Sequence, residues 1–276
     1  MKTSKDKCLV SILLLTFGLL FVGVVIVGGI LFFNEKILMV PTDEFPTISS
    51  AVDMAVEGDI ILVKTKEDGT PYEENVDINT DNIKLIGIGK VKPVIDGDVV
   101  GGIGINLTDR SGVLVQNFSI QNFSGSGFFL SSSNSNMIKG NDVNRSGDFG
   151  IRLLSSSNSN MIKGNSVNGN QQGIVLDSSN RNTLKGNNVN RNMFNGISLD
   201  SSDENLLKGN NVKDTPSFNG ISLDDNSNDN DVFFNRAFGN GNGNTTFDIN
   251  DQNITVPLNN FKENKCDISN KPNICN

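Results

Sequence analysis

Three charged residues occupy related positions in successive repeats of the sequence and could act together on one substrate. Arg152 stands directly before a repeated leucine, and Asp177 and Asp200 stand directly after the same leucine in the next two repeats. Two carboxylates beside a cation can act as general acid and base, or as nucleophile, in the cleavage of a glycosidic bond. Aspartate at the end of a strand also caps the following turn, because it accepts hydrogen bonds from free N–H groups. The sequence alone favours the capping interpretation.

A second group of oxygen-bearing side chains is concentrated between residues 224 and 231. Carboxylate and amide oxygens are the ligands that Ca²⁺ prefers, so Ca²⁺ is the cofactor that this segment suggests. The segment lacks the glycine and the glutamate that an EF-hand loop requires, and a solvated polar turn is the favoured alternative. The candidate ligands are Asp224, Asp225, Asn226, Asn228, Asp229 and Asp231.

The composition excludes several other kinds of chemistry. The chain has 276 residues with no His, no Trp and 3 Cys. Without His there is no Ser-His-Asp or Cys-His nucleophile and no imidazole metal site. Three cysteines are too few for a structural zinc site or an iron–sulfur cluster. The net charge of −8 argues against nucleic acid as a partner, because phosphate binding requires a basic surface.

The candidate residues lie within a repeat of about 23 residues. Each repeat contains short stretches of alternating apolar residues between clusters of Ser, Asn and Gly, which indicates strands and tight turns rather than helices. Repeats of this length are typical of stacked architectures. The sequence therefore predicts an all-β, single-stranded parallel β-helix with three strands per coil. A Gly-apolar-x-Leu tetrad marks each repeat and begins at Gly104, Gly127, Gly150, Gly173, Gly196 and Gly220.

Asparagine recurs at two positions of the repeat, and both are interpreted as structural. Identical residues in a parallel stack lie about 4.8 Å apart, so each side-chain amide can bond to the next. Asn also tolerates the left-handed backbone of sharp turns. We expect one column of Asn117, Asn141, Asn165, Asn187, Asn210 and Asn235, and a second of Asn136, Asn160, Asn182, Asn205 and Asn230.

These repeats resemble the parallel β-helix repeats of pectin-lyase-like proteins, and most closely those of the NosD-type periplasmic copper-binding group. The segment before the repeats, with Phe45-Pro-Thr-Ile48 and Glu57-Gly58-Asp59, is similar to the same group. The resemblance implies a right-handed parallel β-helix over roughly residues 40–265. It leaves the function open, because this fold is shared by lyases, hydrolases, adhesins and spacers. The repeats also lack the cluster of His or Met residues that copper binding would favour.

The N-terminal segment is predicted to lie in a membrane. Residues 8–33 carry no charge, and a helix of this length would be roughly 39 Å long, enough to cross a hydrocarbon core of about 30 Å. Lys2, Lys5 and Lys7 precede the segment, so the positive-inside rule leaves the N-terminus in the cytoplasm. A cleaved signal peptide is the alternative. We expect a single-pass cell-membrane protein whose C-terminal domain is extracellular or periplasmic.

The sequence divides into four predicted parts: a cytoplasmic stub and signal-anchor over 1–36, a linker and N-terminal cap over 37–58, the parallel β-helix over 59–255, and a C-terminal cap over 256–276. The N-terminal cap contains a short helix over residues 46–57, with Thr47 as its N-cap. We expect Cys266 and Cys275 to form a disulfide in the oxidising exterior.

The leading functional hypothesis is a membrane-tethered, non-catalytic protein that presents the flank of its β-helix to carbohydrate or to cell-envelope components. The alternative is a polysaccharide lyase or hydrolase that acts on the face with Arg152, Asp177 and Asp200. A structural spacer or adhesin is the third possibility. Columns of Asp, Ser and Asn without a varied polar cluster favour binding or scaffolding over catalysis.

Overall fold

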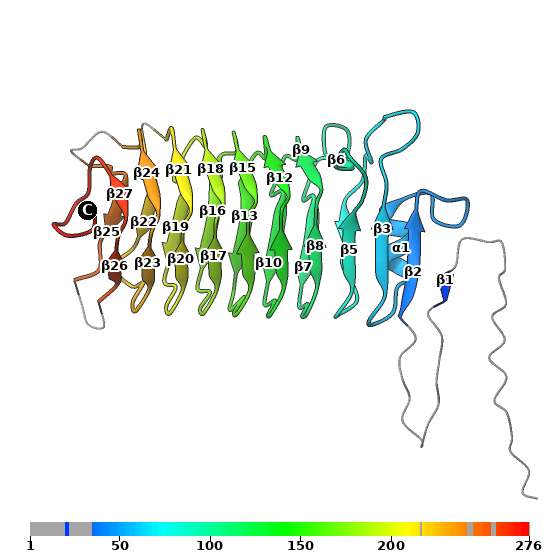
Figure 1. Ribbon diagram of the computed structural model, residues 1–276, viewed down its shortest axis with the longest axis horizontal. Helices are drawn as coiled ribbons and strands as arrows, with labels where there is room; N and C mark the ends of the chain where they lie inside the picture. The colour runs from blue at the N-terminus through cyan, green and yellow to red at the C-terminus, as the bar shows by residue number, and fades with distance from the viewer. Residues whose placement is uncertain (1–19, 22–34, 216, 242–244, 255–257, 276) are drawn as a thin grey trace, which may run out of the picture.

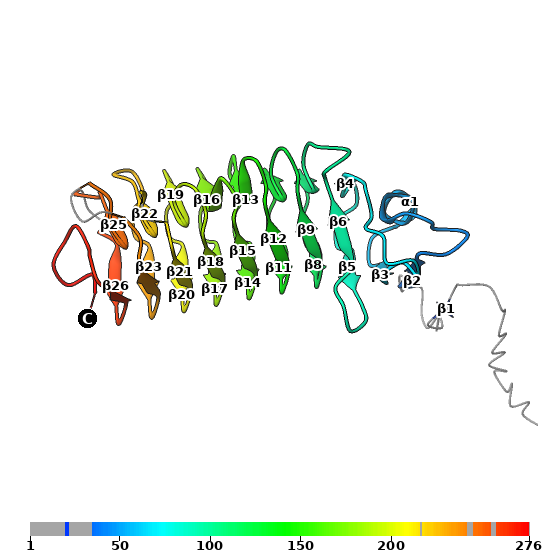
Figure 2. The ribbon, with the colours of Figure 1, turned by 90° about the horizontal axis from the view of Figure 1, so that it is seen from above.

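Three parallel sheets are wound into one elongated right-handed β-helix (Figure 1). The computed structural model describes residues 20–21, 35–215, 217–241, 245–254 and 258–275. From Lys84 to Asp251 each coil passes through one strand of sheet A, one of sheet B and one of sheet C, and each strand pairs in parallel with its equivalent in the next coil. Figure 2 shows the coils stacked along the long axis. The predicted architecture is therefore confirmed.

Sheet A has 11 strands, and sheets B and C have 8 each. Sheet A contains β1 (Leu20–Phe21), β2 (Lys36–Val40), β3 (Ile60–Val63), β5 (Lys84–Gly87), β8 (Leu114–Gln116), β11 (Met137–Lys139), β14 (Met161–Lys163), β17 (Thr183–Lys185), β20 (Leu206–Lys208), β23 (Asp231–Phe233) and β26 (Asn260–Lys262). Sheet B contains β6 (Val94–Asp96), β9 (Ser119–Gln121), β12 (Asp142–Asn144), β15 (Ser166–Asn168), β18 (Asn188–Asn190), β21 (Asn211–Lys213), β24 (Arg236–Phe238) and β27 (Lys265–Cys266). Sheet C contains β4 (Val76–Asp77), β7 (Ile105–Thr108), β10 (Phe128–Ser131), β13 (Phe149–Leu154), β16 (Gln172–Asp177), β19 (Ile197–Asp200), β22 (Ile221–Leu223) and β25 (Ile249–Asp251).

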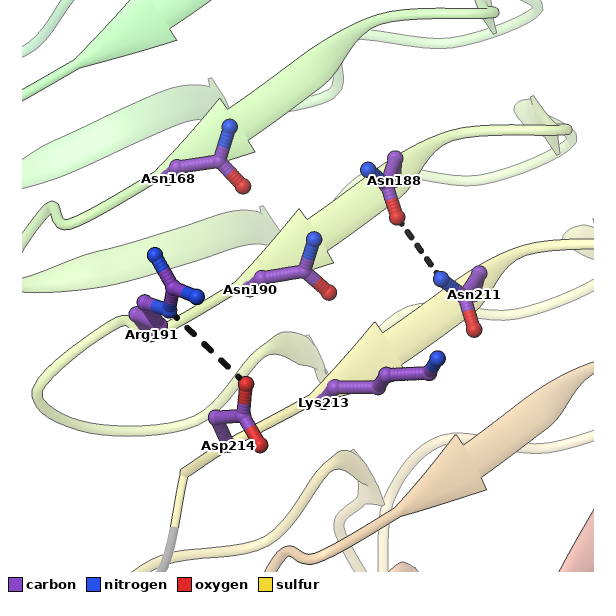
Figure 3. A pocket seen from close by; sticks show the side chains of 7 residues that line it. All are labelled: Asn168, Asn188, Asn190, Arg191, Asn211, Lys213 and Asp214. Atoms are coloured by element: carbon purple, nitrogen blue, oxygen red, sulfur yellow. Dashed lines mark hydrogen bonds and ion pairs between the residues drawn. The ribbon is translucent and has the colours of Figure 1, made fainter.

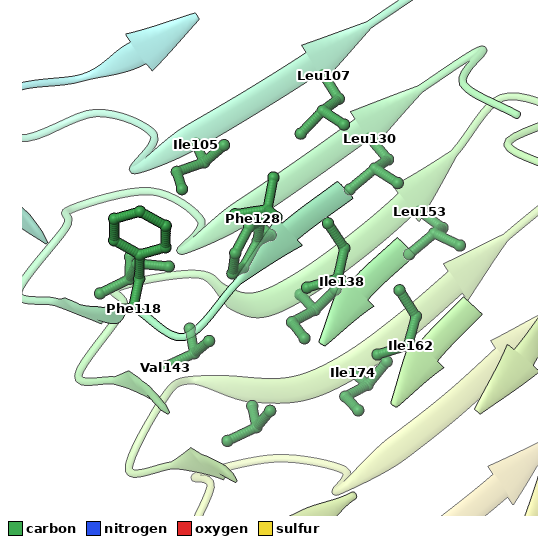
Figure 4. Packing of buried hydrophobic residues seen from close by; sticks show 14 of the residues in the cluster. Ile105, Leu107, Phe118, Phe128, Leu130, Ile138, Val143, Leu153, Ile162 and Ile174 are labelled. Carbon is green, nitrogen blue, oxygen red and sulfur yellow. The ribbon is translucent and has the colours of Figure 1, made fainter. Parts of the chain in front are cut away.

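The core is a stack of apolar side chains that point inward from all three sheets (Figure 4). The Ile and Leu of the tetrads are fully buried, as at Ile151 and Leu153, because alternate residues of a strand face opposite sides. The tetrad glycine lies where two sheets approach closely. A Cβ atom at Gly150 would stand 2.4 Å from Cγ1 of Val167 in sheet B, so any larger residue there would push the two sheets apart.

The first asparagine column lies at the turn between sheets A and B and is buried. The Asn187 side chain shows the pattern: its Nδ2 donates to the Asn210 Oδ1 at 3.0 Å and to the Ile162 carbonyl at 2.9 Å. Its Oδ1 accepts from the backbone N–H of Asn165 at 3.0 Å. Each amide thus satisfies backbone groups that the turn leaves without a strand partner. The column continues beyond Asn235 to Asn264, whose Oδ1 accepts from the Asn235 N–H at 2.9 Å.

Asn117 does not belong to this column, which corrects the sequence-based expectation. Gln116 pairs with Lys139, so Asn117 aligns with Gly140, and Phe118 takes the column position in its coil. The Phe118 N–H accordingly donates to the Asn141 Oδ1 at 2.9 Å. Asn117 has a φ of +67°, a left-handed turn conformation that Asn tolerates, and Gly140 has a φ of +64°. Glycine therefore occupies the position of Asn117 in the next coils, and the buried asparagine column lies one residue later.

Two further polar columns were not anticipated from the sequence. One follows sheet B and contains Asn170 and Asn192, which are joined from the Asn170 Nδ2 to the Asn192 Oδ1 at 3.2 Å. The other is a buried serine column in which each hydroxyl accepts from the backbone N–H of the preceding coil, at 3.0 Å from Ser179 N to Ser202 Oγ. The serine column consists of Ser133, Ser157, Ser179, Ser202 and Ser227.

A short helix, α1 (Ile48–Met54), covers the N-terminal end of the core. Thr47 is its N-cap, and the Thr47 and Ser50 side chains form a reciprocal capping box. The Glu74 carboxylate also accepts from the Ile48 N–H at 2.9 Å. The helix is shorter than the expected 46–57 because Ala55 turns to an extended conformation, with a ψ of 140°. Strand β2, within the predicted linker, pairs with β3 and already belongs to sheet A.

The C-terminal end is closed by residues that continue the coils and then fold back. β26 and β27 extend sheets A and B beyond the predicted boundary at residue 255. A disulfide joins Cys266 to Cys275. Beside it, the Lys271 ammonium lies 2.7 Å from the carboxylate of Asp251, which is only 3% exposed. The ion pair, together with a hydrogen bond of 2.9 Å from the Asn259 Nδ2 to the Asp251 Oδ1, compensates the burial of this carboxylate.

Within the described ranges, no helix has the length and apolar character needed to cross a membrane. The predicted anchor over 8–33 lies outside the described residues, apart from Leu20 and Phe21, which form β1 and pair antiparallel with β2. The membrane anchor therefore stays a prediction.

Candidate functional site on the outer face of sheet C

The outer face of sheet C collects the charged residues that the sequence analysis singled out. Arg152 extends from β13, Asp177 from the end of β16 and Asp200 from the end of β19. In the strand register Asp177 is paired with Asp200, and Arg152 is paired with Val175, two residues before Asp177. The structure thus brings the three predicted residues together on consecutive coils.

Arg152 crosses from its own coil to the next. Its Nη2 lies 3.2 Å from the Asp177 Oδ2, and its guanidinium carbon lies 4.6 Å from the centre of the Phe149 ring. The Arg152 and Asp177 side chains are 27% and 34% exposed, so solvent screens the pair only in part. The guanidinium is held on two sides and keeps N–H groups near the outer surface.

Asp200 has the most perturbed environment on this face. Burial by surrounding protein atoms raises the pKa of its carboxyl although part of the side chain reaches solvent, and the Asp224 and Asp177 carboxylates raise it further. A hydrogen bond from the Ser198 hydroxyl, 3.2 Å from Oδ1, and the charge of Arg152 oppose this shift. The result is a carboxyl that takes up a proton more readily than an ordinary aspartate.

Aromatic rings border the charged residues, and sequence reasoning missed most of them. Phe129 is paired with Arg152 in the register, and Phe149 lies against the guanidinium. Phe194 and Phe218 meet edge to face with their ring centres 4.7 Å apart. The signal was available, because Phe194 and Phe218 each stand two residues before a tetrad glycine. The outer face of sheet C therefore carries aromatic rings as well as carboxylates and hydroxyl groups.

The predicted Ca²⁺ ligands are divided between two faces. Asp224 continues the acidic column of sheet C, and its Oδ1 accepts from the Ser227 hydroxyl at 2.6 Å. Asp231 lies in β23 on sheet A, where it accepts from the Asn260 Nδ2 at 3.2 Å. In the part of the chain that the structure describes, no group of three or more His, Cys, Asp or Glu could hold a metal ion. Ca²⁺ binding stays a prediction.

A shallow groove on sheet B is the other surface feature of note (Figure 3). Asn168, Asn190 and Lys213 lie one above another on consecutive coils. At its edge, the Arg191 Nε and the Asp214 Oδ2 are 3.8 Å apart. Its lining residues include neither an aromatic ring nor a carboxylate pair, so this groove offers fewer kinds of contact than sheet C.

The face on sheet C can bind a polar ligand in several ways at once. Carboxylates and hydroxyls accept hydrogen bonds from hydroxyl groups, the guanidinium donates them, and rings pack against C–H groups. The groups recur along the axis at the coil spacing of about 4.8 Å, so an extended ligand could meet several coils. One carboxyl on this face also has a raised pKa, which is the property of a general acid.

Solved structures share this fold at low sequence identity. The periplasmic alginate epimerase AlgG aligns with a TM-score of 0.57 and 18% identity over 76% of this chain and 54% of its own. An alginate lyase from Paenibacillus sp. str. FPU-7 aligns with a TM-score of 0.58 and 13% identity over 80% and 92%. The mannuronan C-5 epimerase AlgE4 A-module of Azotobacter vinelandii aligns at 0.54 and 12% over 78% and 73%.

The chain spans about half the length of the periplasmic epimerase, and these similarities establish the fold alone. No curated protein matches the sequence. A family model, described as the right handed beta helix region, matches residues 103–261. The match covers more than half of the chain and every coil that carries the face on sheet C. The protein belongs to the right-handed β-helix family.

Proposed function

We propose that this protein is a membrane-tethered, extracytoplasmic β-helix protein that binds carbohydrate on the outer face of sheet C. The observation that carries the proposal is the cluster of unlike groups around Arg152, where a guanidinium, two carboxylates and an aromatic ring lie on consecutive coils. Sugars present hydroxyl groups at their edges and C–H groups on their faces. A surface with both polar groups and rings matches both features.

The position of the cluster suits a polymer rather than a single sugar. Equivalent residues of consecutive coils are about 4.8 Å apart, and the face continues over β10, β13, β16 and β19 without interruption. Solved structures with this fold include an alginate epimerase and an alginate lyase, which supports a polysaccharide ligand. The likeness of the repeats to NosD-type periplasmic proteins and the uncharged segment over 8–33 support a tethered domain outside the cytoplasm.

Binding without catalysis is the first proposal because the face lacks a complete set of catalytic groups. The chain has no His, and Asp177 is engaged by Arg152. A polysaccharide hydrolase or lyase is the second candidate, and one observation favours it. Asp200 has a raised pKa and lies beside Asp177, which is ion-paired with Arg152. Two neighbouring carboxyl groups of this kind can divide the roles of general acid and ionised carboxylate between them. A purely structural spacer or adhesin would require none of these groups.

A glycan array probed with the purified full-length chain in mild detergent tests the proposal. The wild type is expected to bind a subset of glycans, and Arg152→Ala is expected to lose that binding. Arg181→Ala is the matched control, because it also removes an arginine from an ion pair with a carboxylate, but in an exposed turn. Absence of any bound glycan, or equal binding by Arg152→Ala and wild type, would overturn the proposal.

The same experiment separates binding from catalysis. Each bound glycan is incubated with the protein and analysed by mass spectrometry. Intact glycans after long incubation support binding alone. Shortened or unsaturated products that disappear in Asp200→Asn would replace the first proposal by the second, because that variant removes the carboxyl with the raised pKa.

A further inference from the structure

Sheet A carries a row of lysines that the site on sheet C does not use. Lys139 pairs with Lys163, Lys163 with Lys185, and Lys185 with Lys208 in the parallel register. The four side chains point outward from consecutive coils, since each alternates with a buried residue. Neighbouring members are therefore one coil, about 4.8 Å, apart at the backbone. We call Lys139, Lys163, Lys185 and Lys208 the lysine row.

The charge of the lysine row is not neutralised within the protein. Across the described residues, none of its four ammonium groups forms an ion pair with a carboxylate. Outward positions of sheet A from β8 to β20 hold apolar residues, Thr, Gln and Lys, and no Asp or Glu. Four cations in single file repel one another. The row is thus a local concentration of positive charge on a chain whose net charge is −8.

An apolar column runs directly beside the lysine row. Met137 pairs with Leu114 on one side and with Met161 on the other, and Leu206 continues the column after Thr183. All of these side chains are half-buried. A ligand that follows the row would therefore have cationic groups along one edge and apolar side chains along the other.

We propose that the lysine row binds an extended anionic polysaccharide that lies along the axis of the β-helix, with one negative group near each ammonium. The single-file arrangement with one charge per coil fits a polymer with one negative group per sugar. The apolar column fits the C–H faces of the sugar rings. A polyuronate has both features. This surface is distinct from the face on sheet C, and the proposal does not depend on the function assigned there.

Fluorescence anisotropy with labelled oligogalacturonates tests the proposal on the full-length chain in mild detergent. Wild type is expected to bind a hexasaccharide more tightly than a disaccharide, because the longer chain meets more of the row, and added NaCl should weaken binding. Lys163→Gln combined with Lys185→Gln is expected to reduce the affinity for the hexasaccharide about tenfold, as loss of two partly screened charge contacts would. Both lysines are exposed, so the double variant should remain folded.

The matched control combines Lys90→Gln with Lys265→Gln, which removes the same charge at exposed positions away from the row. It is expected to bind like wild type. Equal weakening by the two double variants would overturn the proposal, because net charge alone would then explain the affinity. An affinity of the Lys163→Gln and Lys185→Gln double variant equal to that of wild type would place the ligand on another surface and also overturn it. Binding to vesicles of anionic phospholipid with no binding to the hexasaccharide would identify a membrane surface as the partner instead.

Discussion

Arg152 and Asp177 tie two consecutive coils together across the outer face of sheet C, with 3.2 Å between the Arg152 Nη2 and the Asp177 Oδ2. The contact is diagonal, because the register places Val175 opposite Arg152. It holds Asp177 next to Asp200, which is paired with it on the following coil. One arginine thus binds the carboxylate of the next repeat, and the strand register places a second carboxylate one coil further along.

The raised pKa of Asp200 leads to a prediction about stability and pH. A carboxyl whose pKa is higher in the folded state than its ordinary 3.8 binds a proton more tightly when folded. The charged carboxylate therefore lowers the free energy of unfolding. This unfavourable effect grows as pH rises from about 3.9 through the raised pKa, and it is complete at neutral pH. We expect Asp200→Asn to raise the melting temperature at pH 7, with a gain of roughly 0.5 kcal/mol after solvent screening. The gain should disappear at pH 3.

Thermal unfolding of Asp200→Asn and wild type between pH 3 and pH 8 provides the measurement. Asp98→Asn is the control, because it makes the same change of side chain at an exposed position outside the strands of sheet C. A melting temperature for Asp200→Asn that is lower than wild type at pH 7 would contradict the prediction.

The buried asparagine column should contribute much more to stability than an asparagine in an exposed turn. Asn187→Ala removes the side-chain hydrogen bonds to Asn210 and to the Ile162 carbonyl, and it also removes the acceptor of the buried Asn165 N–H. We expect a loss of about 1–3 kcal/mol in unfolding free energy. Asn226→Ala, at an exposed position whose Nδ2 donates to the Asp225 Oδ1 at 3.2 Å, should cost under about 0.5 kcal/mol.

Urea denaturation of the two asparagine variants gives the comparison. The slope of the transition should be unchanged, because both variants expose the same surface on unfolding. Coincident transition midpoints for Asn187→Ala and Asn226→Ala would show that the column does not stabilise the coils.

The disulfide between Cys266 and Cys275 should hold the C-terminal cap in place. The two cysteines are 9 residues apart, and closing a loop of this length restricts the unfolded chain by about 2–3 kcal/mol. We expect Cys266→Ser combined with Cys275→Ser to unfold at lower urea concentration and to be cleaved faster by protease within 258–275. Cys8→Ser serves as the control for loss of a thiol. Unchanged cleavage in the double variant would show that the cap is held by its ion pair and hydrogen bonds instead.

The uncharged segment over 8–33 predicts retention in membranes. After fractionation of cells, the full-length protein is expected in the membrane pellet, to resist extraction by high salt and to be released by detergent. A variant that lacks residues 1–34 should be found in the soluble fraction. Recovery of a soluble wild-type protein with a new N-terminus near residue 34 would favour the cleaved signal peptide.

The architecture can be predicted from the sequence, because the information for a coil is local and repeated. Gly-apolar-x-Leu at intervals of 23 and 24 residues specifies where a strand begins and which side chains enter the core. Gly150 illustrates the reason, since a Cβ there would meet Val167 at 2.4 Å. The cap helix also follows from local signals, the N-cap Thr47 and an apolar face. Each of these features depends on neighbours within one or two coils.

Which residues of neighbouring coils lie side by side could be learned only from the three-dimensional structure. A shift of the strand register by one residue places Phe118 instead of Asn117 in the asparagine column. The sequence pattern does not distinguish the two registers, because either residue can stand in a turn. The diagonal reach from Arg152 to Asp177 and the pairing of Lys163 with Lys185 depend on the same register. Coils differ in length, since Ile197 follows its partner Ile174 by 23 residues whereas Ile249 follows its partner Ile221 by 28, so positions align in space through strand hydrogen bonds. Those bonds are formed between segments distant in the chain, and they determine which side chains share an outer face.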